Sequence, residues 1–250
     1  GNTVLGESAL DASVSGGDNT AIGKEALTAL TSGTNNVAVG IQALAANTTA
    51  SNNTAVGRLA LAANTVGTEN TAIGGRALDA NTEGDSNTAL GSISLTANTT
   101  GQNNTGLGRG ALAANTTASN NTALGYNSLT ANTTGANSTA VGANALDAQT
   151  TGGNNTAIGY LAGTSLTTGT SNTALGNSAL EGCVDGINNV AVGFETGTAD
   201  WADNNVGVGY RALKVNTASN NTAVGTSALG TTTTGGFNTA VGSTSLDACT

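Results

Sequence analysis

The chain has 250 residues, of which 2% are aromatic and 8% charged, and it contains no Pro, Met or His. So few large side chains exclude a thick globular core, whereas a thin core of Ala, Val, Ile and Leu can be packed. The net charge of −9 with no basic stripe excludes nucleic acid as a partner. No run of 18 apolar residues occurs, so we expect no membrane insertion.

A phrase close to Asn-Thr-Ala-(Ile/Val/Leu)-Gly returns fifteen times, about every 17 residues. We call its closing glycine the marker glycine, the stretch from one marker to the next a coil, and equivalent positions of successive coils a column. A fixed short period indicates one small unit stacked on itself, and its strict register argues against disorder. The marker glycines are Gly6, Gly23, Gly40, Gly57, Gly74, Gly91, Gly108, Gly125, Gly142, Gly159, Gly176, Gly193, Gly209, Gly225 and Gly242.

The coil from Gly125 to Gly142 predicts the local structure. A short β-branched piece, 139–141, predicts one strand, and a second is expected around Ser128 and Leu129. Gly142 and the Asn- and Gly-rich stretch 131–137 predict tight turns, because these residues tolerate positive φ. We therefore predict an all-β fold, a parallel β-solenoid or β-roll with coils about 4.8 Å apart.

The same repeat predicts the domain organisation. We expect residues 1–250 to form a single continuous solenoid array of about fifteen coils. The chain starts without Met in mid-phrase, and no polar capping unit occurs at either end, although repeat arrays normally need one. We therefore expect a segment of a longer polypeptide.

Two apolar columns run through the repeats. The residue before the marker glycine is always Ile, Val or Leu, and the residue four places after it is usually Leu, with Gly163 and Gly197 interrupting that column. In Thr20-Ala21-Ile22, strand parity places either Ala21 or Ile22 inside the coil. Either a flat Ala column or a ladder of Ile, Val and Leu then faces outward. In both cases an exposed apolar strip of fifteen rungs exceeds what a monomer tolerates, so we expect parallel self-association along the length.

These phrases resemble the head repeats of trimeric autotransporter adhesins, and the Asn132-Thr133-Thr134-Gly135 spacer resembles stretches in bacteriophage tail-fibre proteins. The resemblance covers essentially the whole chain, although the autotransporter repeats are usually shorter than 17 residues. It implies left-handed parallel β-rolls packed as a homotrimer. It also implies an extracellular role, in attachment or spacing on a virion tail fibre or a cell-surface appendage, without catalysis.

We therefore expect a structural and adhesive fibre segment that presents receptor-binding surfaces, with sister chains and a host-surface glycan or protein as partners. The alternative is an ice-binding β-solenoid, because regular Thr columns on a flat face match an ordered water lattice. Such a column contains Thr20, Thr54, Thr71, Thr88, Thr105 and Thr122.

The sequence contains few residue combinations that could support catalysis or bind a metal. Without His, no Ser-His or Cys-His pair exists, and no cluster has zinc-ligand spacing. We predict no enzyme activity, no cofactor and no metal site. Five carboxylates share one column but are mostly several coils apart, which favours a solvated stripe over a cation site: Asp11, Asp79, Asp147, Glu181 and Asp247.

Aromatic residues supply the candidate binding site. Four of the six stand directly after a marker glycine, in a mixed column with several basic residues, where they either pad the coils or contact a sugar or protein. Trp201 lies in the shortened loop between Gly193 and Gly209 and is the first candidate. The other four candidates are Tyr126, Tyr160, Phe194 and Tyr210.

Two residue types carry modification chemistry. Cys183 and Cys249 share a column four coils apart, roughly 19 Å, so no disulfide joins them within one chain. They are free thiols or link to a neighbouring chain.

Asn-x-Ser/Thr sequons are frequent, but the turns and the stacked columns need the same residues, so glycosylation is the minor interpretation. The sequons begin at Asn47, Asn52, Asn98, Asn103, Asn115, Asn120, Asn132, Asn137, Asn154 and Asn220.

Overall fold

The computed structural model describes residues 1–247 and contains three-residue strands joined by turns, with no helix in that range. The chain falls into two compact units, Gly1–Tyr126 and Asn127–Thr250, and each is considered by itself. The first unit contains β1 (Thr3–Leu5), β2 (Thr20–Ile22), β3 (Val37–Val39), β4 (Thr54–Val56), β5 (Thr71–Ile73), β6 (Thr88–Leu90), β7 (Thr105–Leu107) and β8 (Thr122–Leu124). The second contains β9 (Thr139–Val141), β10 (Thr156–Ile158), β11 (Thr173–Leu175), β12 (Val190–Val192), β13 (Val206–Val208), β14 (Thr222–Val224) and β15 (Thr239–Val241).

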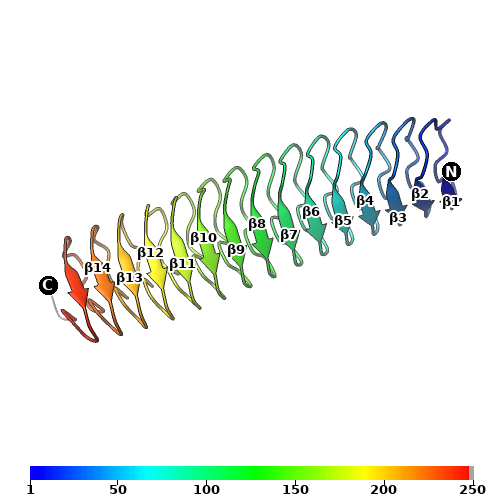
Figure 1. The fold of residues 1–250 in the computed structure, drawn as a ribbon. Coiled ribbons are helices and arrows are strands. Elements are labelled where there is room, and N and C mark those ends of the chain that lie inside the picture. The colour runs from blue at the N-terminus through cyan, green and yellow to red at the C-terminus, as the bar shows by residue number, and fades with distance from the viewer. Residues whose placement is uncertain (248–250) are drawn as a thin grey trace. The chain divides into compact units, whose positions relative to one another are not determined.

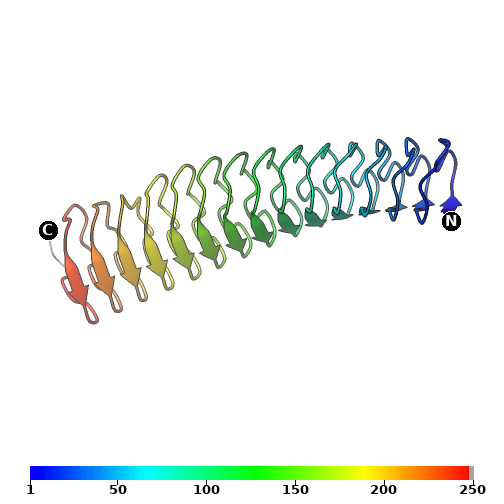
Figure 2. The same ribbon diagram turned by 45° about the horizontal axis from the view of Figure 1, so that its top comes forward.

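Within each unit the strands pair in parallel and in chain order (Figure 1). The register is the same at every step, so that Ala38 pairs with Ala55 and Ala55 with Ala72. In both views the strands of a unit share one side of its coils, and the turns make up the rest (Figure 2). The predicted all-β parallel solenoid with about 17 residues per coil is confirmed.

The predicted turns and strands agree with the structure in one half of the coil only. Gly142 and Asn137 have φ of 130° and 59°, which confirms the turns on both sides of β9. The second strand expected around Ser128 and Leu129 is wrong, because this stretch is a turn and Leu129 has φ of 50°. Left-handed residues break the alternation that a pleated strand requires.

The marker glycine is required for two physical reasons. Gly57 has φ of 137°, a conformation that residues with a Cβ rarely adopt. A Cβ on Gly57 would also lie 2.5 Å from the carbonyl oxygen of Gly74 in the next coil. No other residue therefore allows adjacent coils to approach to one strand spacing at this corner.

Strand parity is resolved in favour of Ala inside the coil. In β4 Ala55 is fully buried, whereas Thr54 and Val56 point outward and are partly exposed. Leu90 of β6 leaves 42% of its surface exposed. We call the outward Ile, Val and Leu residues before the marker glycines the apolar ladder. The ladder contains Leu5, Ile22, Val39, Val56, Ile73, Leu90, Leu107, Leu124, Val141, Ile158, Leu175, Val192, Val208, Val224 and Val241.

The second apolar column fills the interior despite an unfavourable backbone. Leu44 is fully buried with φ of 51°, and its N–H donates to Ala60 O in the next coil at 3.0 Å. A left-handed conformation costs a residue with a Cβ about 1–2 kcal/mol. Burying a leucine side chain contributes about 1.5–3 kcal/mol, so the burial outweighs the strain.

Two columns of buried Asn complete the interior of the first unit. The Asn70 N–H donates to Asn53 Oδ1 at 2.9 Å, and its own Oδ1 accepts the Asn87 N–H at 2.9 Å. The side-chain amide of Asn70 donates to Gly84 O at 2.8 Å, and that of Asn81 donates to the same oxygen at 3.0 Å. Each asparagine thus satisfies backbone groups that the turns leave without partners.

In some irregular coils one side-chain replacement is matched by a second. Gly106 stands where β strands usually carry Ala, because a Cβ there would lie 2.5 Å from Ser94 Oγ. Ser94 in turn replaces an Ala and donates its hydroxyl to Gly106 O at 2.9 Å. Likewise Gly163 interrupts the Leu column where Leu166 occupies an Asn position, and a Cβ on Gly163 would lie 3.1 Å from Leu166 Cδ1.

This pairing predicts that a second substitution restores the stability lost by the first. Gly106→Ala alone should lower the free energy of unfolding by about 1–3 kcal/mol, because the added methyl overlaps Ser94 Oγ. The double variant Ser94→Ala/Gly106→Ala should recover at least the parental value, since it recreates the Ala77 and Ala89 pair of the preceding coil. Urea denaturation measures both.

Gly75→Ala is the matched control, because a Cβ at Gly75 has no atom within 4 Å and its φ is not left-handed. It should leave stability unchanged or slightly raised. Equal losses in Gly75→Ala and Gly106→Ala would show that the interior does not depend on these matched pairs.

Candidate binding surfaces

Trp201, the first candidate from the sequence, is not a binding residue. Its side chain is fully buried, and its Nε1–H donates to Leu213 O at 2.9 Å. The indole occupies interior space beside Gly197 and Gly207, where regular coils carry Leu and Ala. It therefore offers no surface to a ligand, and the prediction is corrected.

Two glycines make room for this indole. A Cβ on Gly197 would lie 2.6 Å from Trp201 Cε2, and a Cβ on Gly207 would lie 2.7 Å from Trp201 Cη2. The gap in the Leu column at Gly197 and the missing Ala of β13 at Gly207 are the only sequence signals of this burial. Read together, these two substitutions could have identified Trp201 as an interior residue.

The other four candidates are exposed. Tyr126 closes the first unit, and Tyr160, Phe194 and Tyr210 lie in the second, with 43–52% of each residue exposed. Phe194 and Tyr210 stack in adjacent coils, with ring centroids 5.9 Å apart and planes at 6°. The structure thus brings two of the four together.

A charged group borders this aromatic pair. The Arg211 guanidinium lies 4.8 Å from the Tyr210 ring centroid, and its Nε–H donates to Glu195 Oε2 at 2.8 Å. Lys214 Nζ donates to the same oxygen at 2.9 Å. These hydrogen bonds, first from Lys214 and then from Arg211, lower the pKa of Glu195. The carboxylate therefore stays ionised and holds both cations against the coil.

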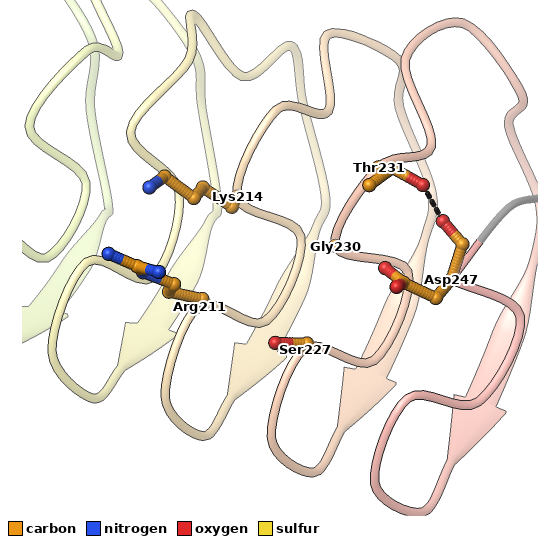
Figure 3. A pocket seen from close by; sticks show the side chains of 6 residues that line it. All are labelled: Arg211, Lys214, Ser227, Gly230, Thr231 and Asp247. Carbon is orange, nitrogen blue, oxygen red and sulfur yellow. Dashed lines mark hydrogen bonds between the residues drawn. The ribbon is translucent and has the colours of Figure 1, made fainter.

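A hollow of about 160 Å³ lies beside these cations in the second unit (Figure 3). It exists because Ser227 and Gly230 place little side chain between neighbouring coils. Figure 3 shows Arg211 and Lys214 extending away from Gly230, as their bonds to Glu195 require, so their charges do not enter the hollow. The lining residues are Arg211, Lys214, Ser227, Gly230, Thr231 and Asp247.

Two members of the predicted carboxylate stripe accept local hydrogen bonds. Asp79 accepts hydrogen bonds from Arg76 Nε at 2.7 Å and from Thr96 Oγ1 at 2.6 Å. Asp147 accepts one from Thr164 Oγ1 at 2.5 Å. Among residues 1–247 no group of three or more His, Cys, Asp or Glu side chains is placed to hold a metal ion.

Burial divides the sequons into two classes. Asn47, Asn98, Asn115 and Asn132 are fully buried in the interior columns. The second class lies in left-handed turns just before the strands, where the side chains are exposed or partly exposed: Asn52, Asn103, Asn120, Asn137, Asn154 and Asn220. Only this second class has an accessible acceptor nitrogen in the folded chain.

Cys183 is a buried free thiol that replaces an interior Asn, and Cys249 lies outside the described residues. The Sγ–H of Cys183 donates to Trp201 O at 3.4 Å. Burial raises the pKa of the Cys183 thiol from 9.0 to about 12, and the neighbouring Asp200 and Asp185 add to the increase. The thiol is therefore protonated and unreactive at neutral pH.

Comparison of the chain with protein-family models and with curated proteins finds no match. Within the part of the chain that the structure describes, no helix is long and apolar enough to cross a membrane.

The burial of Trp201 has a direct spectroscopic consequence. Iodide should not quench the fluorescence of this single tryptophan until the chain unfolds, because the indole has no accessible surface. Quenching in the folded chain would show that Trp201 is a surface residue.

Gly207→Ala should lower the free energy of unfolding by about 1–3 kcal/mol, and by less in a Trp201→Phe background, where the smaller ring leaves room.

Thiol reactivity tests the environment of Cys183. In a Cys249→Ser variant, a thiol-reactive dye at pH 8 should label Cys183 only at the rate of unfolding. Because the folded pKa lies above the unfolded one, the stabilising effect of the protonated thiol is complete below pH 9 and declines as the pH rises towards 12. Rapid labelling of the native chain would contradict this burial.

Proposed function

We propose that the chain is an extracellular structural and adhesive fibre segment whose copies associate along the apolar ladder. The observation that carries the proposal is the outward direction of this ladder, with Ile73, Leu90 and Leu124 at 37–42% exposure. The interior does not need these side chains, because Ala, Leu and Asn columns fill it.

The size of the ladder supports association. If each ladder residue exposes on the order of 60 Å² of apolar surface, the eight residues of the first unit together expose roughly 500 Å² of contiguous apolar surface. Monomers rarely expose larger patches, and patches of this size are often functional. The Thr column on the same strand face adds methyl groups, which brings the surface towards the roughly 800 Å² per partner of a stable interface.

The arrangement of the copies follows from the resemblance to trimeric adhesin heads and tail-fibre repeats. We propose left-handed coils in a parallel homotrimer, with equal rungs level and the apolar ladders turned towards the threefold axis. Charged and aromatic columns then face outward and present contacts to a host-surface glycan or protein. The absence of His and the scattered carboxylates, of which Asp79 and Asp147 are held by local hydrogen bonds, favour a fibre over an enzyme.

Charges placed on the ladder should dissociate the assembly. The parent should sediment with three times its chain mass of 23.9 kDa, whereas Leu90→Lys/Leu124→Lys should sediment as one chain, because burying unpaired charges is costly. Thr100→Lys/Thr117→Lys adds the same charge to exposed turns and should remain associated. A parent chain that is monomeric at micromolar concentration contradicts the proposal.

An ice-binding solenoid is the second candidate, because the structure places a Thr column and the apolar ladder side by side on one strand face. In β6 both Thr88 and Leu90 are exposed outward around buried Ala89. The repeat along each column is one strand spacing, about 4.8 Å. Against ice binding, Thr alternates with a large apolar residue and not with a second Thr.

Thermal hysteresis separates the two candidates. The fibre proposal predicts a trimer without hysteresis, because the strand face is buried. An ice binder would be a monomer whose hysteresis is lost in Thr71→Tyr/Thr88→Tyr, since bulky rings disturb the flat face. The Thr100→Tyr/Thr117→Tyr control places the same rings on exposed turns and should not change such an activity.

A further inference from the structure

Side chains directly after the marker glycines stack on those of the adjacent coil. In the second unit Phe194 and Tyr210 lie parallel with centroids 5.9 Å apart. In the first unit the Arg109 guanidinium lies over the Tyr126 ring at 5.9 Å. This column therefore turns its ring faces along the direction in which the coils stack.

Asn177 interrupts the aromatic column of the second unit. One face of Phe194 is covered by Tyr210, so its other face is turned to the coil that carries Asn177. Tyr160 stands in the same column one coil further and is 52% exposed, with no ring partner among the described residues. Tyr160 and Phe194 are thus separated by two strand spacings, about 9.6 Å.

We propose that this interrupted column binds a saccharide, with one pyranose ring between Tyr160 and Phe194 and above Asn177. The inference rests on the proposed adhesive function and names its ligand class. Stacked rings prefer centroid separations of about 4.5–7 Å, so two successive contacts need about 9–14 Å. The two-coil interval supplies this separation, whereas the interval between Phe194 and Tyr210 is closed.

Polar groups beside the rings suit the hydroxyls of a sugar. Asn177 Oδ1 accepts the Ser178 hydroxyl at 3.0 Å, which leaves the amide N–H₂ to donate outward. The Glu195 carboxylate is bound to Arg211 and Lys214 on the other side of Phe194, so it does not enter this interval. Two apolar faces with a hydrogen-bond donor between them fit a pyranose better than a purely apolar ring.

Ring signals in NMR spectra test the proposal, because the chain has only three Tyr and two Phe. With ¹³C-labelled rings, the probes are methyl β-D-glucopyranoside, methyl α-D-mannopyranoside and N-acetylglucosamine, titrated separately. At least one should shift Tyr160 and Phe194 saturably, with a Kd on the order of 1–10 mM. Tyr126 and the 84% exposed Phe237 should not shift.

Variants assign the effect to the interruption. Asn177→Phe completes the aromatic column and should weaken binding at least tenfold, as should Tyr160→Ala. Tyr126→Ala removes a ring from the same column of the first unit and should not change the affinity. Sedimentation of each variant reports whether it remains assembled.

The proposal is overturned if none of the three sugars shifts Tyr160 and Phe194 saturably, or if Phe237 shifts equally. A trimer without such shifts would refute saccharide binding and leave the fibre proposal intact. A monomer that shows them would refute the fibre proposal and leave the saccharide site.

Discussion

Within each unit, inward asparagines tie the coils together, because their side-chain oxygens accept a backbone N–H one coil away. Ser138 replaces the asparagine once, and its hydroxyl oxygen accepts the Asn155 N–H. Asn70 shows the complete pattern, since it links Asn53, Asn87 and the carbonyl of Gly84. An unpaired buried N–H costs about 1–3 kcal/mol, so a shift of register by one residue would be penalised at every coil. This repeated bond fixes the columns, and the columns determine every surface of the molecule.

The surfaces follow from what the interior can hold. Two asparagine columns and one leucine column leave room only for Ala at the centre of each strand, as at Ala55 and Ala72. The flanking strand residues must then point outward, which creates the Thr column and the apolar ladder on one face. The aromatic and charged residues after the marker glycines lie at the turn that follows the strand, where they contact side chains of adjacent coils.

The period, the parallel stacking and the strand at Asn-Thr-Ala-x-Gly were predictable because glycine and asparagine spacing reports backbone geometry directly. The sequence did not show whether Ala or Ile points into the coil. The two faces of a three-residue strand alternate in the same way in either case. The second strand was predicted wrongly because Leu129 has an apolar side chain in a left-handed turn, where burial outweighs backbone preference. Trp201 was misjudged because its space comes from the side chains that Gly197 and Gly207 lack, and neither glycine by itself indicates a buried indole.

Hydrogen exchange in Asn70→Ala tests the central role of the asparagine columns most directly. The substitution removes the acceptor of the Asn87 N–H, so the account predicts a loss of about 1–3 kcal/mol in protection at Asn87 and its neighbouring strands. Gln102→Ala, which truncates an exposed turn residue, should leave protection unchanged. Unchanged protection at Asn87 in Asn70→Ala would contradict the claim that these side chains hold the coils in register.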